Sequence, residues 1–316
     1  MPGAINHHRL FMPLFPLAFE SFNLSGYDLV LSSHHMAAKG VITTPSTCHI
    51  CFCHTPMRYA WDFYHDFIRE NPSPLRTPLR LLFHYLRAWD TITASRVDYF
   101  IANSRNVANR IHKYYRRNSE VIHSPVQTAR FHIADKKEGF YLVVSRLVSY
   151  KRIDLAVETF NQLGKKLVVV GSGPELKKLK KMARKNIDFT GFVPDAELPD
   201  YYARCRAFIF PAEEDFGITP LEAQAAGTPV VAYRAGGALE SVLDGKTGIF
   251  FDRQTPDSLA QAVLQLEKTD FNPIAIRQHA EKFDVEIFKN KIQNFIEDKM
   301  KLWSRNKHET VEQNMY

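Results

Sequence analysis

The chain has 316 residues, 45% of them apolar, and a formal net charge of +7, which is enough apolar material for one large or two ordinary cores. No stretch reaches the roughly 18–20 consecutive apolar residues of a membrane-spanning helix, and four cysteines do not indicate a disulfide framework. The apolar run at residues 11–19 is interrupted by Pro13 and Pro16 and lacks the cleavage site of a signal peptide, so we expect a soluble, cytoplasmic chain.

In the first half, short apolar runs predict strands at residues 28–32, 49–53, 99–102 and 120–122. One long helix is predicted at about 79–94. The cluster Cys48-His49-Ile50-Cys51-Phe52-Cys53-His54 raises the question of a metal. Alternate residues of a strand point to opposite faces and cannot all converge on one ion, so we expect buried strand cysteines and no metal. The stretch His123 to Thr128 has a proline and no apolar periodicity, which is typical of a domain boundary.

The second half alternates short apolar runs with helical patterns, as a parallel sheet covered by helices requires. Strands are predicted at 140–145, 166–170, 187–190, 207–210, 229–232 and 248–251. Helices are predicted at 152–163, 174–185, 196–204, 220–226, 239–243, 256–267 and 274–282. A final amphipathic helix is expected at 285–303, and we expect the polar tail after Arg305 to be frayed.

The most informative segment is Glu213-Glu214-Asp215-Phe216-Gly217-Ile218-Thr219-Pro220-Leu221-Glu222. Glu214 and Glu222 stand eight positions apart, with a glycine and an expected helix start between them. A strand on each side makes this a βαβ unit, in which a loop at the carboxyl end of a strand opens a helix N-terminus. Such a terminus binds anions and suits a diphosphate. Glu214 would face the group that the phosphate carries, and Glu222 could reach a ribose.

Three upstream segments accompany this motif in order: Val143 to Asp154 with Arg146 and Lys151 five apart, Val168 to Glu175 with two glycines, and Phe189 to Val193. Together they resemble the retaining group 1 glycosyltransferases of the GT-B fold. The segment Cys51 to Trp61 resembles the acceptor domain of a mannosyltransferase-like branch. The resemblance implies an α/β fold of two Rossmann-like domains facing a cleft. It covers an N-terminal acceptor-side domain at 1–126 and a nucleotide-sugar-binding domain at 127–284, followed at 285–316 by a helix that crosses back and a polar tail.

The start of the chain departs from that family. Family members open with an apolar strand and a glycine-rich turn, whereas this chain opens with Pro2-Gly3-Ala4-Ile5-Asn6-His7-His8. We therefore expect a truncated N-terminal domain, or a true start upstream of Met1. A domain without its first strand would expose sheet edges and apolar helix faces.

The resemblance assigns roles to individual residues. Arg146 and Lys151 would grip the leaving diphosphate without a metal, Glu214 would lie beside the transferred sugar, and His54 would face the reacting sugar from the acceptor domain. Glu222 would bind the ribose. The remaining donor-binding residues would be Gly171, Gly173, Phe192, Val193, Phe216, Gly217, Ile218 and Thr219. Arg58, Tyr59 and Trp61 could shape the acceptor pocket or simply pack.

The expected function is transfer of a hexose, with mannose from GDP-mannose favoured, to a glycan or lipid-linked acceptor with retention, in surface polysaccharide or lipopolysaccharide synthesis. No cofactor is expected. A UDP-sugar donor and a non-catalytic nucleotide-sugar-binding remnant or scaffold stay open as alternatives. Basic stretches at 177–185 and 110–117 are either solvated helix faces or a peripheral contact with an anionic membrane, such as the inner face of the cell membrane. No motif indicates nucleic acid.

Overall fold

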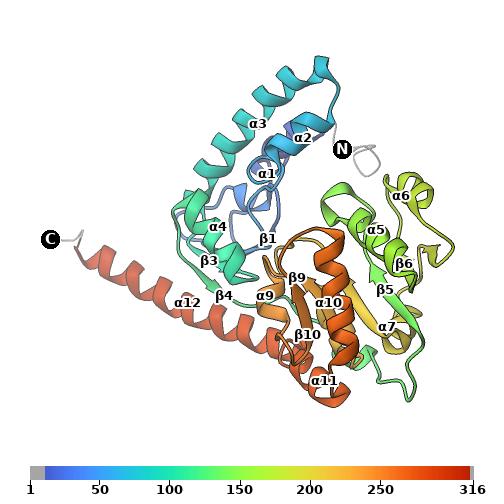
Figure 1. The fold of residues 1–316 in the computed structure, drawn as a ribbon. Coiled ribbons are helices and arrows are strands. Elements are labelled where there is room, and N and C mark those ends of the chain that lie inside the picture. Colours follow the sequence, from blue (N-terminus) through green and yellow to red (C-terminus); the bar gives the residue numbers. More distant parts are fainter. Residues whose placement is uncertain (1–10, 314–316) are drawn as a thin grey trace. The chain divides into compact units, whose positions relative to one another are not determined.

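The structure is a computed structural model that describes residues 11–313, with side chains from 11 to 305 (Figure 1). The opening Pro2 to His8, on which the expected truncation depends, lies outside the described residues. Contacts divide the chain into two compact units. The N-terminal unit holds residues up to Ile122 together with those from Asn290, and the C-terminal unit holds His123–Lys289.

The division after Ile122 lies before the boundary at residue 126 that the sequence suggested. Val126 explains the position, because it is buried in the core of the C-terminal unit and its N–H donates to Phe283 O at 2.9 Å. Anchored in this way, the segment from His123 belongs to the C-terminal unit.

The last helix, α12 (Val285–Gln313), begins where the sequence predicts but continues past the expected end at residue 303. Its first residues, up to Lys289, group with the C-terminal unit and the rest with the N-terminal unit. Residues 304–313 contain neither proline nor glycine, so the backbone has no reason to leave the helix there. The predicted helix end at residue 303 is therefore wrong, since the helix continues to Gln313.

The N-terminal unit is built on a parallel sheet of four described strands in the order β1-β2-β3-β4. Its strands are β1 (Leu29–His34), β2 (Cys48–Cys53), β3 (Tyr99–Ala102) and β4 (Ser119–Val121). Its helices are η1 (Met12–Leu14), α1 (Phe15–Glu20), η2 (Ala38–Gly40), α2 (Tyr64–Glu70), α3 (Ser73–Thr93), η3 (Ala94–Arg96) and α4 (Arg105–Tyr115). The four predicted strands are all present, with ends that shift by at most two residues.

Every residue of β2 is buried, because a parallel strand covered on both faces needs no polar face. Its cysteines are buried, as the sequence predicts, and the described structure shows no disulfide between them. Both ring nitrogens of His49 in this strand have hydrogen-bond partners: Nε2 lies 2.8 Å from Ser32 Oγ, and Nδ1 lies 3.2 Å from Arg96 O.

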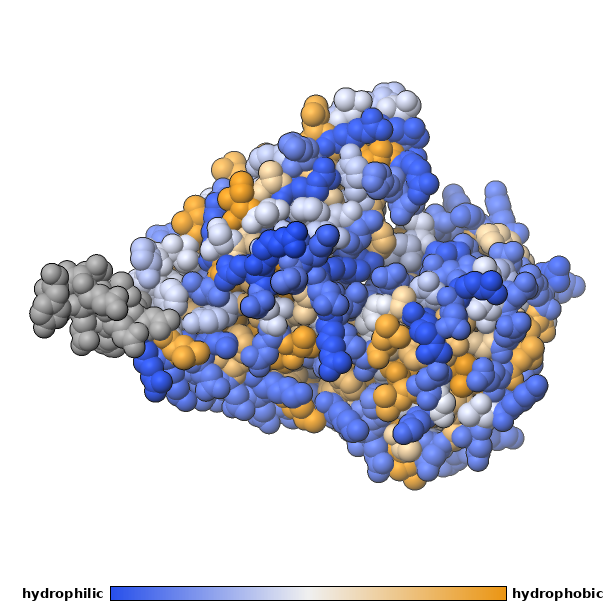
Figure 2. All heavy atoms as spheres, turned by 60° about the vertical axis from the view of Figure 1, so that its left-hand side comes forward, coloured by the Kyte–Doolittle hydropathy of each residue, from blue (hydrophilic) through white to orange (hydrophobic). Residues whose placement is uncertain are grey.

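Helix α3 begins at Ser73, six residues before the predicted start at 79. Pro74 falls in its first turn, where a missing N–H costs nothing, and Pro78 removes a single bond. The helix buries Phe83, Leu86 and Trp89 but leaves four large apolar side chains exposed, namely Leu75, Leu81, Tyr85 and Ile92. Figure 2 colours exposed leucine and isoleucine residues orange against the hydrophilic surface.

The sequence did not predict α4, although its signals are present. The Ser104 hydroxyl accepts from Val107 N at 3.1 Å and caps the helix, and Val107, Ile111 and Tyr115 are buried at a spacing of four residues. The basic stretch at 110–117 lies on and after this helix. Arg110 pairs with Asp62 at 3.1 Å, and Arg117 donates to two backbone oxygens. Both arginines therefore have structural partners, so this stretch is not simply a solvated face.

The C-terminal unit has a six-stranded parallel sheet in the order β10-β9-β8-β5-β6-β7. Its strands are β5 (Phe140–Val144), β6 (Lys166–Val170), β7 (Ile187–Gly191), β8 (Ala207–Phe210), β9 (Val230–Tyr233) and β10 (Gly248–Phe251). Its helices are η4 (Thr128–Arg130), η5 (Ser149–Lys151), α5 (Ile153–Leu163), α6 (Leu176–Met182), α7 (Leu198–Arg204), α8 (Ile218–Ala225), α9 (Ala238–Ser241), α10 (Pro256–Lys268) and α11 (Pro273–Glu281). The sequence predicts all six strands and the seven α-helices among these, with ends that shift by up to three residues.

Alternate residues of these strands feed two cores. Leu142, Val170 and Phe208 pack on one face with α7, α8, α9 and α11. Their neighbours Tyr141 and Val169 pack on the other face with α5, α6 and α10. Helices therefore cover both faces of the sheet, and its carboxyl edge remains for loops.

Candidate active site

The winding of the C-terminal sheet reverses at its centre. From β5 the chain builds outward through β6 and β7, then returns to place β8, β9 and β10 on the other side of β5. In open α/β sheets ligands bind outside the carboxyl ends of the strands at such a switch point. The loops after β5 and β8 meet this description, and they carry Arg146, Lys151, Glu214 and Gly217.

Lys151 and Glu214 join these two loops. Lys151 Nζ lies 2.7 Å from Glu214 Oε1, and both side chains are largely buried. Arg146 follows β5 by two residues and is exposed. Within the described part of the chain, its guanidinium has no ion pair. The structure thus brings two of the predicted reacting residues together. The loop after β5, which carries Lys151, also carries the exposed cation of Arg146.

Gly217 caps the start of α8 in the left-handed region, with φ +86°. A Cβ at this position would lie 2.9 Å from Phe210 Cζ, so both backbone conformation and space favour glycine. The N–H groups of the first helical turn, which include those of Ile218 and Thr219, have no partner within the helix. They form an anion site with the positive end of the helix dipole.

Phe216 is buried, and its ring stacks on His123 with centroids 5.2 Å apart and also packs against Phe283. His123 Nε2 in turn lies 2.9 Å from Glu240 Oε2. The Phe216 side chain therefore belongs to the core. A contact of Phe216 with a donor would have to come from its backbone, and this assignment stays a prediction.

Glu222 lies in α8 and its partner is Tyr202 of α7, whose hydroxyl donates to Glu222 Oε2 at 2.7 Å. Burial raises the pKa of the Glu222 carboxyl above its usual value near 4.5, while the Tyr202 hydrogen bond and the charge of Arg130 oppose that rise. Burial, then the charge of Glu222, raise the pKa of the Tyr202 hydroxyl well above its usual value, so the hydroxyl stays protonated and donates. Sequence reasoning missed Tyr202, because nothing in the sequence links α7 to a residue twenty positions later.

The predicted glycines hold loops against one another. A Cβ on Gly171 would lie 1.9 Å from Ser145 O, and one on Gly173 would lie 2.2 Å from Leu147 O. The loop after β6 therefore packs directly on the backbone of the loop after β5. In the same way, a Cβ on Gly237 would lie 2.2 Å from Phe216 Cα. This close packing accounts for these glycines, and a contact with a nucleotide remains a prediction for Gly171 and Gly173.

Phe192 and Val193 differ in exposure. Phe192 is 77% exposed, whereas Val193 is buried in the core. Of the two side chains, only that of Phe192 could cover a base. A contact of Val193 with a base would have to come from its backbone, and it stays a prediction for both residues.

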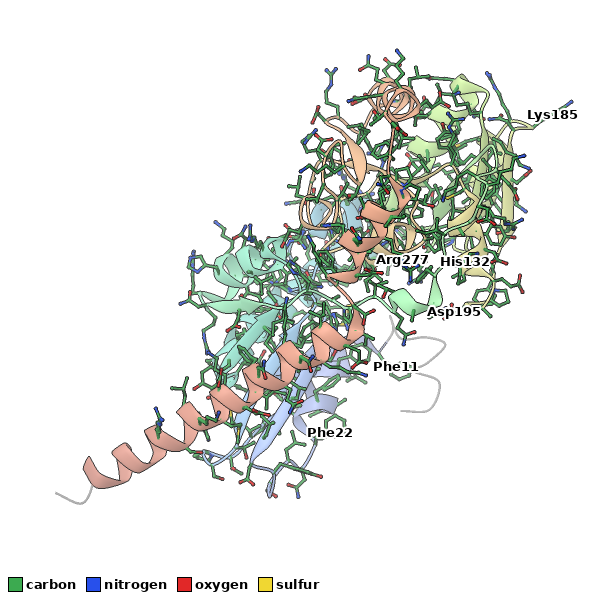
Figure 3. All side chains as sticks on the ribbon, turned by 90° about the horizontal axis from the view of Figure 1, so that it is seen from below. Phe11, Phe22, His132, Lys185, Asp195 and Arg277 are labelled. Atoms are coloured by element: carbon green, nitrogen blue, oxygen red, sulfur yellow. The ribbon has the colours of Figure 1, made fainter. Side chains whose placement is uncertain are left out.

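Helix α8 is held firmly at its other end. Arg277 of α11, labelled in Figure 3, donates through Nη1 to Ala225 O at 2.8 Å and to Phe131 O at 2.7 Å. A cation at a helix C-terminus satisfies a free carbonyl and complements the dipole. Arg277 thereby ties the C-terminal end of α8 to α11 and to the backbone at Phe131.

The remaining predicted residue, His54, lies in the N-terminal unit directly after β2. Its Nε2 lies 2.9 Å from Ser33 Oγ, and its ring packs against Phe52. The loop that follows is fixed by α3 and α4. The Trp61 Nε1–H donates to Asp90 Oδ2 at 2.8 Å, and the indole stacks on Tyr114 at 4.4 Å. Trp61 therefore packs in the unit, as one of the two readings of this residue expected.

Asp90 also forms a buried ion pair with Lys39, a residue that the sequence did not single out. Lys39 Nζ lies 2.9 Å from Asp90 Oδ1 and donates to Asp90 O at 2.5 Å and to Thr93 Oγ1 at 2.7 Å. Both side chains are fully buried. Tyr115 OH completes the group by donating to the Asp90 carboxylate at 2.9 Å. Nothing in the sequence marks Lys39 or Asp90 as buried, because a lone lysine and a lone aspartate ordinarily lie on the surface.

Among the described residues, no group of three or more histidine, cysteine, aspartate or glutamate side chains is arranged to hold a metal ion. The described helices also include none with the length and apolar character needed to cross a membrane.

Two family models match the chain. Residues 127–283 match the model described as "Glycosyl transferases group 1", and residues 1–130 match the model described as "Glycosyltransferase Family 4". The two matches divide the chain near the boundary between its two units.

Among curated proteins, the chain is similar to the GDP-mannose-dependent alpha-(1-6)-phosphatidylinositol monomannoside mannosyltransferase of Mycolicibacterium smegmatis. The two are 38% identical over 138 residues, which are 38% of this chain and 36% of that protein. The chain thus matches little more than a third of the length of this relative.

Among solved structures, the chain resembles sucrose-phosphate synthase from Thermosynechococcus elongatus, with a TM-score of 0.70 at 18% identity over 92% of this chain and 79% of that one. It also resembles Anabaena HepE in complex with UDP, with a TM-score of 0.64 at 19% identity over 94% and 84% of the two chains. At these identities the likeness concerns the fold.

Proposed function

Because the chain belongs to the group 1 glycosyltransferases, we propose that it transfers a hexose from a nucleotide sugar to a glycan or lipid-linked acceptor. Its two parallel α/β sheets and its likeness to two solved structures confirm the GT-B fold expected from the sequence. GDP-mannose is the favoured donor, because the curated relative is named as a GDP-mannose-dependent mannosyltransferase. We propose retention of the anomeric configuration and a role in surface polysaccharide or lipopolysaccharide synthesis.

The observation that carries this proposal is the Lys151–Glu214 ion pair, which joins the loops after β5 and β8 at the switch point of the C-terminal sheet. Arg146, Lys151 and the N-terminus of α8 would hold the diphosphate and stabilise the charge that develops on it as it leaves. Glu214, which is paired with Lys151 at 2.7 Å, would face the hydroxyls of the sugar. Glu222 would accept from the ribose, and His54 would act from the acceptor side.

The positive charge in this proposal comes from protein groups, so we propose that no metal is required. Peripheral contact with an anionic membrane surface is also part of the proposal. It is supported by the exposed apolar side chains of α3, among them Leu81 and Tyr85, and by Arg80, which is exposed on the same helix. Exposed apolar and basic side chains on one helix are typical of a helix that lies at a membrane surface.

Nucleotide binding and turnover test the proposal together. GDP or GDP-mannose should raise the thermal unfolding midpoint of the full chain, since a ligand stabilises by RT ln(1 + [L]/Kd). Sugar transfer to an acceptor should follow and persist in excess EDTA. Arg146→Ala should lower turnover by roughly 10²–10³, the usual effect of removing one preorganised charge-stabilising group. The control is Arg206→Ala, because Arg206 precedes β8 at the opposite edge of the same sheet.

The alternatives predict different results. A response to UDP and not to GDP would favour a UDP-sugar donor, which Anabaena HepE makes reasonable because its structure holds UDP. Binding of a nucleotide sugar without transfer or hydrolysis would favour a non-catalytic binder. Equal activity of the Arg146→Ala and Arg206→Ala variants would contradict the diphosphate assignment.

A further inference from the structure

Tyr202 and Glu222 form a pair with a fixed orientation. The Tyr202 hydroxyl donates to Glu222 Oε2 at 2.7 Å. Within the described part of the chain, Glu222 Oε1 receives no hydrogen bond from another residue. The pair therefore holds one carboxylate oxygen and leaves the other for a ligand.

The tyrosine itself has no freedom to move. It is fully buried, and its ring packs against Phe131 and Phe208 with centroids 5.7 and 5.5 Å away. Its backbone oxygen accepts from Thr228 Oγ1 at 2.6 Å. Because packing and this hydrogen bond hold Tyr202 in place, its hydroxyl also holds Glu222 Oε2 in one orientation.

We propose that Tyr202 is a positioning residue for nucleotide recognition, which holds Glu222 Oε2 so that Oε1 faces the vicinal hydroxyls of a ribose. This inference rests on the proposed function and deepens its donor site. A carboxylate oxygen has two lone pairs and can accept from both hydroxyls of a diol. A carboxylate free to rotate would have to lose that freedom on binding, and the fixed tyrosine removes this cost before the ligand arrives.

The tyrosine has a second effect, on charge. Burial disfavours the ionised form of Glu222 and raises its pKa, and the Tyr202 hydrogen bond is the first factor that opposes this, followed by the charge of Arg130. The charge of Asp195 acts in the same direction as burial. Loss of the hydroxyl should therefore raise the pKa of Glu222 further, and with it the pH below which a ribose is no longer bound.

The test compares two tyrosines of the C-terminal unit. Tyr202→Phe removes the proposed positioning bond. Tyr141→Phe is the matched control, because Tyr141 is equally buried and its hydroxyl donates to Glu267 Oε1, also at 2.7 Å, in the core on the other face of the sheet. The dissociation constants of GDP and 2′,3′-dideoxy-GDP are measured for the full chain. If the chain prefers UDP, the same measurement uses UDP and 2′,3′-dideoxy-UDP.

The ratio of the two dissociation constants measures how much the ribose hydroxyls contribute to binding. The wild type and Tyr141→Phe should bind GDP roughly tenfold more tightly than its dideoxy analogue, since a hydrogen bond to a charged group is worth about one decade. Tyr202→Phe should reduce this preference to less than about threefold, and its GDP affinity should fall at a higher pH than in the control. An unchanged preference in Tyr202→Phe would overturn the inference while leaving the proposed function intact. Failure of the wild type to bind either nucleotide would overturn both.

Glu222→Gln tests the same point if Tyr202→Phe does not fold. Because the Tyr202 hydroxyl needs an acceptor, the amide should turn its oxygen to Tyr202 and its NH₂ group to the ligand. The preference for GDP should then fall below about threefold with little change in the unfolding midpoint, because the neutral amide can offer only bonds weaker than those of a carboxylate. A preserved tenfold preference would mean that ribose recognition does not need the carboxylate that Tyr202 holds, and it would overturn the inference.

Discussion

Lys39 and Asp90 show at the scale of single residues how a charge is accommodated in a core. All the donors that Lys39 Nζ offers are matched by Asp90 Oδ1, Asp90 O and Thr93 Oγ1. The carboxylate also accepts from Tyr115 and Trp61. A buried pair so completely hydrogen-bonded is strongly interdependent, because removal of one member leaves the other charged without a partner.

Asp90→Ala should therefore lower the free energy of unfolding by about 3–5 kcal/mol, the usual cost of breaking a buried pair. Urea unfolding of the full chain measures this. The double variant Lys39→Met/Asp90→Ala should be less destabilised than Asp90→Ala alone, because no charge is then left unpaired. The control is Lys289→Ala, whose exposed partner Glu286 lies 2.7 Å away and whose loss should have little effect. A double variant that is less stable than Asp90→Ala would contradict this account.

Residues of this kind mark the limit of sequence reasoning at this scale. Arg146, Glu214 and Glu222 were predicted because a local motif contains them. Tyr202 and Asp90 were not, because their roles depend on contacts between α7 and α8 or between α3, α4 and the loop after β2. Such contacts exist only once the chain has folded.

Among the elements, the loops at the carboxyl edge of the C-terminal sheet depend on glycine contacts for their positions. Gly237 N donates to Glu214 O at 2.9 Å, and its missing Cβ leaves room for the Phe216 backbone. Its φ of −69° is open to any residue. Substitution of Gly237 by alanine therefore tests only whether the site has room for a Cβ atom, because the backbone conformation is not strained for alanine.

Gly237→Ala should weaken nucleotide binding by about tenfold or more, because the new methyl group would displace the loop at 213–217 that opens α8. Isothermal titration with GDP measures the change. Gly139→Ala is the matched control, since a Cβ there meets nothing within 4 Å. Equal affinity in the two variants would show that the loop moves aside without effect on the ligand.

The elements themselves were predicted unevenly. The runs 167–170 and 207–210 in the C-terminal unit are continuously apolar, as buried parallel strands require, and their strands β6 and β8 have the predicted ends. Helices α1, α2 and α4 of the N-terminal unit were not predicted. In α4, basic residues such as Arg110 obscured the apolar spacing of Val107, Ile111 and Tyr115.

At the scale of the whole molecule, both units bury histidines that resist protonation. Burial, and then the charge of Lys39, lower the pKa of His34 well below 6.5. Burial also lowers the pKa of His49 and of His279, the latter in the C-terminal unit. The unfolded chain binds these protons near pH 6.5 while the folded chain does not, so acidification below that pH favours unfolding.

The free energy of unfolding should therefore fall as the pH drops from about 7 to about 5, by at most about 1.4 kcal/mol per pH unit for each such histidine. His34→Gln should flatten this slope, whereas His35→Gln, at an exposed neighbour, should not. Tryptophan fluorescence is the suitable probe, because Trp61, Trp89 and Trp303 all belong to the N-terminal unit. Identical slopes in the two variants would exclude His34 as a source of acid sensitivity.

The close packing of the carboxyl-edge loops also bears on how this protein could be re-engineered. Gly171 and Gly173 let the loop after β6 pack on the loop after β5. The Lys151–Glu214 ion pair joins the loop after β5 to the loop after β8. Gly237 lets the loop after β9 pack on the loop after β8. An inserted or deleted residue in any of these loops would thus be transmitted to the other three. Changes of donor preference by loop grafting should fail here, and libraries should instead vary exposed side chains at fixed loop length, beginning with Phe192.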